Sequence, residues 1–168
     1  PYRRQRQMCI RDRINTMKTA MIIASDAGAR TAGIIREELG KEVDLFSVSE
    51  RSGCVRIDSI TDFTLRHFGD YEAFVFIGAM GICVRAIAPC VTSKYADPAV
   101  VNVDATGHFV VSVLAGHVGG ANALTERLAR ILGAQPVVTT QSDNTGLWAL
   151  DLLGKENGWK MEYRRSLN

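Results

Sequence analysis

The sequence predicts an α/β fold: a doubly wound, mostly parallel sheet with helices on both faces and one antiparallel hairpin. Two observations predict this class. First, short runs of branched apolar residues alternate along the chain with segments of helical period. Second, the run at 73–77 (AFVFI) is apolar throughout, which is typical of a central parallel strand covered on both faces.

Taken in order, the apolar runs and the periodic segments alternate as this fold requires. Strands are predicted at 19–25, 43–48, 73–77, 100–103, 109–113 and 136–140. Helices are predicted at 29–39, 60–68, 82–92, 121–132 and 147–157. Pro89 falls inside one of these helices and should kink or split it, because proline removes a backbone hydrogen bond. The strands on either side of residues 104–108 are joined by a short turn, so they should form the antiparallel hairpin.

The composition is that of one ordinary globular domain. The 168 residues are 46% hydrophobic and 23% charged, and no apolar run approaches the roughly 20 residues of a membrane span. Residues 1–16 hold five arginines and one aspartate, a net charge of +4. The total net charge is +2, so the remaining residues have a net charge of −2. We therefore expect no nucleic acid or membrane partner. We interpret residues 1–16 as a disordered leader or a gene-calling artefact ahead of a domain at 17–151.

The four cysteines show no C-x-x-C spacing, which argues against a disulfide framework and against a zinc site. A cytoplasmic location is the resulting expectation. Cys83 and Cys90 are seven residues apart, so they should share a helix face and pack as small apolar residues.

The stretch at 110–133 organises the candidate site. A buried strand (VVSVL), a glycine-rich turn and an amphipathic helix follow one another, and Gly116, Gly119 and Gly120 lie in the turn. The first N–H groups of such a helix have no partner within it, so they attract an anion. His117 lies in the same turn, and a histidine is able to move protons near neutral pH. The alternative is that the glycines only permit close packing and that His117 caps a backbone group.

Other predicted strand ends also carry glycine or polar residues. A second glycine turn, 78–81 (GAMG), leads into the helix that carries Arg85, and Asp104 directly follows an apolar strand. Ligands bind at the carboxyl ends of the strands in open α/β sheets, so we expect these residues and the turn at 116–120 to gather along one rim. Neither turn has the spacing of a dinucleotide fingerprint or a Walker lysine.

Simpler interpretations exist for some of these charged side chains. Arg85 is equally well explained as a solvated arginine, and Lys94 with Asp97 as a surface ion pair. A carboxylate directly after an apolar strand is costly unless it is paired or lies in a cleft, and we favour the cleft for Asp104.

The runs at 76–89 (FIGAMGICVRAIAP) and 94–143 closely resemble the N-terminal domain of the CbiG family of cobalamin-biosynthesis proteins. Its most specific segments are D-P-A-V-V, G-H-x-G-G-A-N and T-T-x-x-D. The resemblance covers most of 17–151. It implies an α/β domain of a cobalt-precorrin-5A hydrolase, which opens the δ-lactone of a ring-contracted cobalt corrinoid and releases acetaldehyde.

The resemblance also implies partners. Family members usually continue through a linker into a separate C-terminal domain, so residues 152–168 are expected to begin that linker. The expected partners are therefore a cobalt-precorrin substrate, the chain's own C-terminal domain and other enzymes of the corrin pathway. The cobalt belongs to the substrate, so we expect no cofactor and no metal site in the protein.

We assign roles on the lactone chemistry that this resemblance implies. His117 is the expected general base, with Asp104 or Asp143 orienting it, while N–H groups of Gly119 and Gly120 stabilise the oxyanion. Gly119 is expected to need a positive φ angle. The other residues expected to bind the substrate are Gly78, Met80, Gly81, Arg85, Lys94, Gly116, Asn122, Thr139 and Thr140. The alternatives are a domain that only binds the macrocycle, with catalysis elsewhere, and a generic nucleotide-binding domain.

Overall fold

The computed structural model describes residues 16–40 and 42–140. The chain divides into two compact units, 1–138 and 139–168, and the fold below is that of the first unit. The expected leader, the helix predicted at 147–157 and the expected linker lie outside the described residues.

Strands and helices alternate along the first unit, as the sequence pattern predicts. The elements are β1 (Thr19–Ile23), α2 (Gly28–Leu39), β2 (Val43–Ser47), β3 (Val55–Arg56), α3 (Ile60–His67), β4 (Ala73–Ile77), α4 (Met80–Ile87), β5 (Ala99–Val103), β6 (Phe109–Leu114), α5 (Ala121–Leu132) and β7 (Gln135–Val137).

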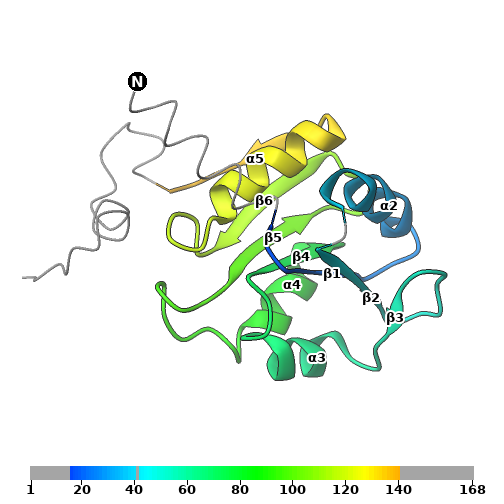
Figure 1. The fold of residues 1–168 in the computed structure, drawn as a ribbon, viewed down its shortest axis with the longest axis horizontal. Coiled ribbons are helices and arrows are strands. Elements are labelled where there is room, and N and C mark those ends of the chain that lie inside the picture. The colour runs from blue at the N-terminus through cyan, green and yellow to red at the C-terminus, as the bar shows by residue number, and fades with distance from the viewer. Residues whose placement is uncertain (1–15, 41, 141–168) are drawn as a thin grey trace, which may run out of the picture. The chain divides into compact units, whose positions relative to one another are not determined.

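The strands form one sheet in the order β3-β2-β1-β4-β5-β6-β7 (Figure 1). Neighbouring strands run parallel except β5 and β6, which are antiparallel. The predicted class, a mostly parallel sheet with one antiparallel hairpin, is therefore confirmed.

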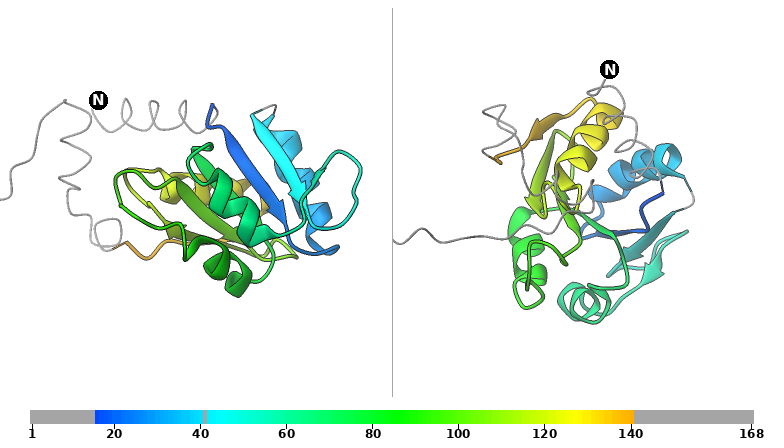
Figure 2. Two further views of the ribbon diagram at one scale, coloured as in Figure 1. Left: turned by 90° about the horizontal axis from the view of Figure 1, so that it is seen from below. Right: turned by 60° about the vertical axis from the view of Figure 1, so that its left-hand side comes forward.

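The helices cover both faces of the sheet. Helices α2 and α5 lie on one face and α3 and α4 on the other; seen from below, α3 and α4 are in front of the sheet (Figure 2). Successive residues of a strand point to opposite faces, so Met21 and Ile23 pack with Leu124 of α5, whereas Ile22 packs with Cys83 of α4. This two-layer core explains why β1, β4 and β5 are buried along their whole length.

Helix α4 differs from its predicted extent. It ends at Ile87 rather than near residue 92, so Pro89 lies beyond the helix and does not kink it. Proline has no N–H to donate to the carbonyl four residues earlier, and the chain turns instead, with the N–H groups of Cys90 and Val91 both donating to the Ile87 carbonyl. Cys83 and Cys90 are both buried in the same apolar cluster, as predicted, but they do not share a helix face, because Cys90 lies beyond the end of α4.

The two edge regions of the sheet also differ from prediction. The short strand β3 pairs with Phe46 and Ser47 at one edge, where the sequence predicts only a polar loop. Near the opposite edge of the sheet, only Val110 of β6 is fully buried and residues 111–114 are half-buried. The apolar run of this strand predicts burial on both faces instead. Strand β7 begins and ends earlier than its predicted range.

Candidate functional site

The sheet presents its loops at two opposite edges. The carboxyl ends of β1, β2, β4 and β5 meet at one edge, which we call the carboxyl edge. Strand β6 runs antiparallel to β5, so its carboxyl end and the turn that follows lie at the other edge, which we call the glycine-turn edge. The expectation that both glycine turns share one rim is therefore wrong.

This direction of β6 separates Asp104 from His117. Asp104 follows β5 where Val103 pairs with Val110, whereas His117 follows β6 beyond the pair of Val100 with Leu114. A strand of five or six residues spans about 17–20 Å. Asp104 therefore lies too far from His117 to orient its ring.

The carboxylate of Asp104 braces the turn between β5 and β6. It accepts hydrogen bonds from the N–H of Phe109 at 2.6 Å, from the N–H of Thr106 at 3.1 Å and from the Thr106 hydroxyl. Burial on its own raises the pKa of Asp104, but these hydrogen bonds, with one from the backbone of His108, outweigh it and leave the pKa below its usual value. The cleft role favoured on sequence is replaced by a structural one.

The glycine-rich turn between β6 and α5 is tightly closed and locally strained. Ala115 has a φ of 56°, the only positive φ of a non-glycine residue in the part of the chain that the structure describes. Gly120, which precedes α5, has a φ of 90°. The N–H groups of Ala121 and Asn122 donate to the carbonyls of Ala115 and Gly116. Strained backbone of this kind is concentrated at functional sites.

The side chain of Asn122 supports this turn from within. It is 8% exposed, and its Oδ1 accepts a hydrogen bond from Ser112 Oγ at 2.7 Å. A Cβ at Gly116 would lie 2.6 Å from that Oδ1, so a larger residue there would displace the Asn122 side chain. The structure therefore brings Gly116 and Asn122 together, with Asn122 placed to position the turn.

Gly119 is required for a different reason from the one predicted. It does not have a positive φ; instead, a Cβ there would lie 2.5 Å from Ala115 Cβ and 2.8 Å from the Ala115 carbonyl oxygen. It would also approach the backbone nitrogen of Ala99, at the start of β5, to 3.3 Å. Gly119 thus holds the turn against the neighbouring strand.

His117 is half-buried in this turn and makes polar contacts of its own. Two backbone N–H groups, those of Gly119 and Gly120, lie close to it in sequence. Neither has a hydrogen-bond partner among the described residues, so both are able to donate to a ligand. An imidazole and two unused N–H donors in one tight turn can together accept a proton and stabilise a negative charge.

The loop at 92–98 lies at the same edge, since it leads directly into β5 at Ala99. Asp97 is 7% exposed and accepts hydrogen bonds from the N–H groups of Thr92 and Ser93 and from the Thr92 hydroxyl. Asp97 therefore closes its own loop rather than pairing with Lys94. Lys94 is exposed, and its Nζ lies 4.9 Å from the centre of the Tyr95 ring.

The second glycine turn belongs to the carboxyl edge. The N–H of Gly78 donates to the Val103 carbonyl at 2.9 Å, and a Cβ at Gly78 would lie 2.8 Å from Ala24 Cβ. Arg85 is exposed on α4, and its Nη1 donates to the Gly81 carbonyl at 3.3 Å. Met80 is the first residue of α4. These four predicted residues, Gly78, Met80, Gly81 and Arg85, are close to one another but not to His117.

Three predicted residues fall outside the first unit. Thr139 and Thr140 begin the second unit, where Thr139 is exposed and Thr140 half-buried. Asp143 lies outside the described residues. Their roles stay predictions.

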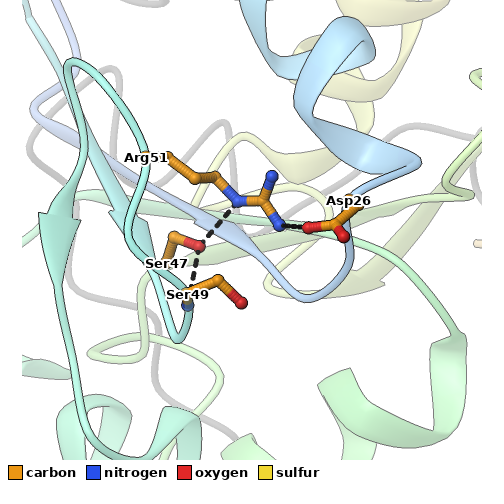
Figure 3. A network of polar contacts seen from close by, with 4 residues as sticks. All are labelled: Asp26, Ser47, Ser49 and Arg51. Carbon is orange, nitrogen blue, oxygen red and sulfur yellow. Dashed lines mark hydrogen bonds and ion pairs between the residues drawn. The ribbon is translucent and has the colours of Figure 1, made fainter.

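A polar network that the sequence analysis did not identify also lies at the carboxyl edge (Figure 3). Arg51, from the loop after β2, donates through Nε to Ser47 Oγ at 2.9 Å and through Nη2 to the carboxylate of Asp26. Ser47 Oγ also accepts from the N–H of Ser49 at 3.2 Å. A carboxylate after the first strand was visible in the sequence, but its arginine partner is 25 residues away and follows no local pattern.

Two further findings concern the described residues, 16–40 and 42–140. No group of three or more His, Cys, Asp and Glu side chains there is arranged to hold a metal ion. No helix in this part of the chain has the length and apolar character needed to cross a membrane.

Comparison with known proteins gives consistent matches. Residues 62–143 match the family model described as "Cobalamin synthesis G N-terminal". The chain is 50% identical over 99 residues to a cobalt-precorrin-5A hydrolase of Salmonella typhimurium and 47% identical over 95 residues to one of Priestia megaterium. These matches cover 59% and 56% of this chain but 28% and 25% of the relatives, so the chain spans about a quarter of their length.

A solved structure is similar as well. It is the crystal structure of a cobalamin biosynthesis protein G homologue from Sulfolobus solfataricus, with a TM-score of 0.60 and 26% sequence identity. The similarity covers 75% of this chain and 38% of that chain. The α/β fold is therefore shared with that protein.

Proposed function

We propose that this chain supplies the amino-terminal part of a cobalt-precorrin-5A hydrolase, because residues 62–143 match the family model described as "Cobalamin synthesis G N-terminal". The reaction opens the δ-lactone of a ring-contracted cobalt corrinoid and releases acetaldehyde. The names of the two bacterial relatives support this activity. A cytoplasmic location is part of the proposal, supported by Cys54, Cys83 and Cys90, which are free thiols.

The glycine-turn edge is the site that we assign to the substrate. The carrying observation is that the N–H groups of Gly119 and Gly120, in the same tight turn as His117, have no hydrogen-bond partner among residues 16–40 and 42–140. Lys94, exposed in the loop at the same edge, would pair with acetate or propionate groups of the macrocycle. Gly116 and Asn122 position the turn. Thr139, Thr140 and Asp143 are further candidates for contacts with the substrate.

The chemistry that these groups would perform is hydrolysis of an ester. His117 takes a proton from water as its oxygen attacks the lactone carbonyl carbon. The oxyanion that forms accepts hydrogen bonds from the N–H groups of Gly119 and Gly120. The ring C–O bond then breaks, and the imidazolium of His117 returns its proton to the leaving oxygen. Asp104 lies at the opposite edge, so it does not orient His117. The role of Asp143, which lies outside the described residues, stays a prediction.

A second candidate is a domain that binds the macrocycle without catalysing its hydrolysis. Two observations favour it: the chain spans about a quarter of the relatives, and the carboxylates of Asp97 and Asp104 are both held by backbone N–H groups. The catalytic groups would then lie in the part of the relatives that this chain does not match.

The test is release of acetaldehyde from cobalt-precorrin-5A. The chain is assayed alone and as a replacement for the matching part of the Salmonella relative. If His117 is the base, His117→Ala lowers kcat about 10²- to 10⁴-fold in the active form. If the domain only binds, His117→Ala raises KM and leaves kcat unchanged.

The matched control is His108→Ala, which removes an exposed imidazole at the carboxyl edge and should change neither constant. Absence of acetaldehyde from the replacement enzyme, with the protein folded, would contradict the proposed function.

A further inference from the structure

A groove lies between α2 and the loop that follows β2, outside the residues that match the family model. Its volume is about 500 Å³, within the range of about 300–1,000 Å³ typical of small-molecule sites. We propose that this groove binds an amphipathic monoanion, a ligand with an apolar body and a single carboxylate.

The groove is open because α2 presents small residues to it. Ala29, Ala32 and Gly33 are spaced so that they share one face of the helix, and all three line the groove. A Cβ at Gly33 would meet no atom within 4 Å, and Gly33 does not have a positive φ. Neither packing nor backbone geometry therefore requires this glycine, although it costs the helix up to about 1 kcal/mol relative to alanine. The effect of Gly33 is to keep the groove open along this face of α2.

The floor of the groove is apolar. Ile23, at the end of β1, and Leu45, in β2, line it together with Ala32. All three belong to the buried core cluster beneath α2 and are less than a tenth exposed. An apolar ligand body would therefore contact a surface that is already fixed by the core.

Arg51 lines the groove as a cation that is already held in place. Its side chain is 15% exposed, and Ser47 and Asp26 accept hydrogen bonds from Nε and Nη2 (Figure 3). Nη1 takes part in neither bond. Because the guanidinium is fixed before binding, a carboxylate that accepts from Nη1 would lose little of its energy to ordering the side chain.

A second arginine crosses the groove. Arg36 reaches from α2 to the loop, where its Nη1 donates to the Gly53 carbonyl at 3.1 Å. Glu37 also lines the groove and offsets the charge of Arg36, while Asp26 offsets that of Arg51, so these four side chains have no net charge. A single carboxylate at Nη1 of Arg51 is therefore better matched than a doubly charged phosphate.

The first test measures binding of octanoate to the chain by titration calorimetry. We expect saturable binding to one site, and 1-octanol, which lacks the charge, should bind at least about tenfold more weakly, the equivalent of about 1.4 kcal/mol. Gly33→Leu should abolish binding by filling the groove. Gly69→Leu is its control, because a Cβ at Gly69 also meets no atom within 4 Å but Gly69 does not line the groove.

The second test removes charge from the same helix at two places. Arg36→Gln should weaken octanoate binding about tenfold. Arg30→Gln removes an exposed arginine of α2 that does not line the groove, so the affinity should stay at the parent value. This pair decides the question even if Gly33→Leu fails to fold.

Three results would overturn the proposal. They are no saturable binding of octanoate, equal binding of octanoate and 1-octanol, and parent affinity in Arg36→Gln. The readout is binding alone, so failure of the hydrolase assignment would leave these results unaffected.

Discussion

The two edges of the sheet use their polar groups in different ways. At the carboxyl edge, Asp104 accepts hydrogen bonds from its own turn and Asp26 is held by Arg51, so these carboxylates stabilise loops. At the glycine-turn edge, Ala115 is strained and the N–H groups of Gly119 and Gly120 are unused among the described residues. Hydrogen-bonding capacity that the fold does not consume distinguishes the candidate site from an edge with equally polar residues.

The largest effect on stability is expected at Gly119, in the glycine turn. We expect Gly119→Val to lower the free energy of unfolding by about 3 kcal/mol or more, because the new side chain would overlap Ala115 and approach Ala99. Urea unfolding of the folded fraction measures this change. A variant as stable as the parent would show that the turn is not closed against β5.

At the carboxyl edge, Asp104→Asn should lower stability at neutral pH by about 2 kcal/mol, because charge-assisted hydrogen bonds to the turn are lost. Catalytic constants should be unchanged. The effect should depend on pH. The folded pKa of Asp104 lies below its unfolded value of about 3.9, so the ionised form stabilises the fold above that value.

This contribution is lost as the pH falls through the folded pKa of Asp104, so the difference between parent and Asp104→Asn should shrink in acid. Thermal melts between neutral and acidic pH measure it. A difference that is constant over that range would mean that the carboxylate is not ionised in its turn.

Gly120 offers a smaller change next to Gly119. Its φ of 90° disfavours a side chain, but a Cβ there meets no atom within 4 Å. Gly120→Ala should therefore cost only about 1 kcal/mol, the penalty for left-handed backbone. Comparing its urea midpoint with that of Gly119→Val separates backbone strain from steric overlap. Equal losses in the two variants would contradict this distinction.

The smallest effect is expected at Arg85. Its side chain is exposed at the carboxyl edge and donates only to the Gly81 carbonyl. Arg85→Gln should change stability by less than about 0.5 kcal/mol and leave acetaldehyde release unaltered. A large rise in KM would instead extend the substrate site to the carboxyl edge.

Much of the fold was predictable because its signals are local. The continuous apolar run of β4 identifies a strand, and the helical spacing of the apolar residues of α5 identifies a helix, each from neighbouring residues alone. The end of α4 was predicted wrongly, because a proline is compatible both with a kinked helix and with a helix that ends before it, and α4 ends before Pro89. The strand β3 was missed because two exposed residues form a strand only by pairing with β2.

The candidate site was predictable in part. The sequence identified the turn with His117, and in the structure a Cβ at Gly119 would overlap Ala115, so this glycine is needed for contact rather than for φ. The partnership of Asp104 with His117 was wrong, because the antiparallel direction of β6 puts the two loops at opposite edges. Arg51 carried no signal, since its contact with Asp26 joins loops that are distant in the chain.

The sequence by itself determined the alternation of strands and helices, the class of the sheet and the glycine turn before α5. Period and turn chemistry are properties of short stretches, so they can be read without knowing the neighbours in space. Only the tertiary structure decided which loops meet. An antiparallel strand carries the turn after it to the opposite edge of the sheet, while the residues of that turn look the same in either position.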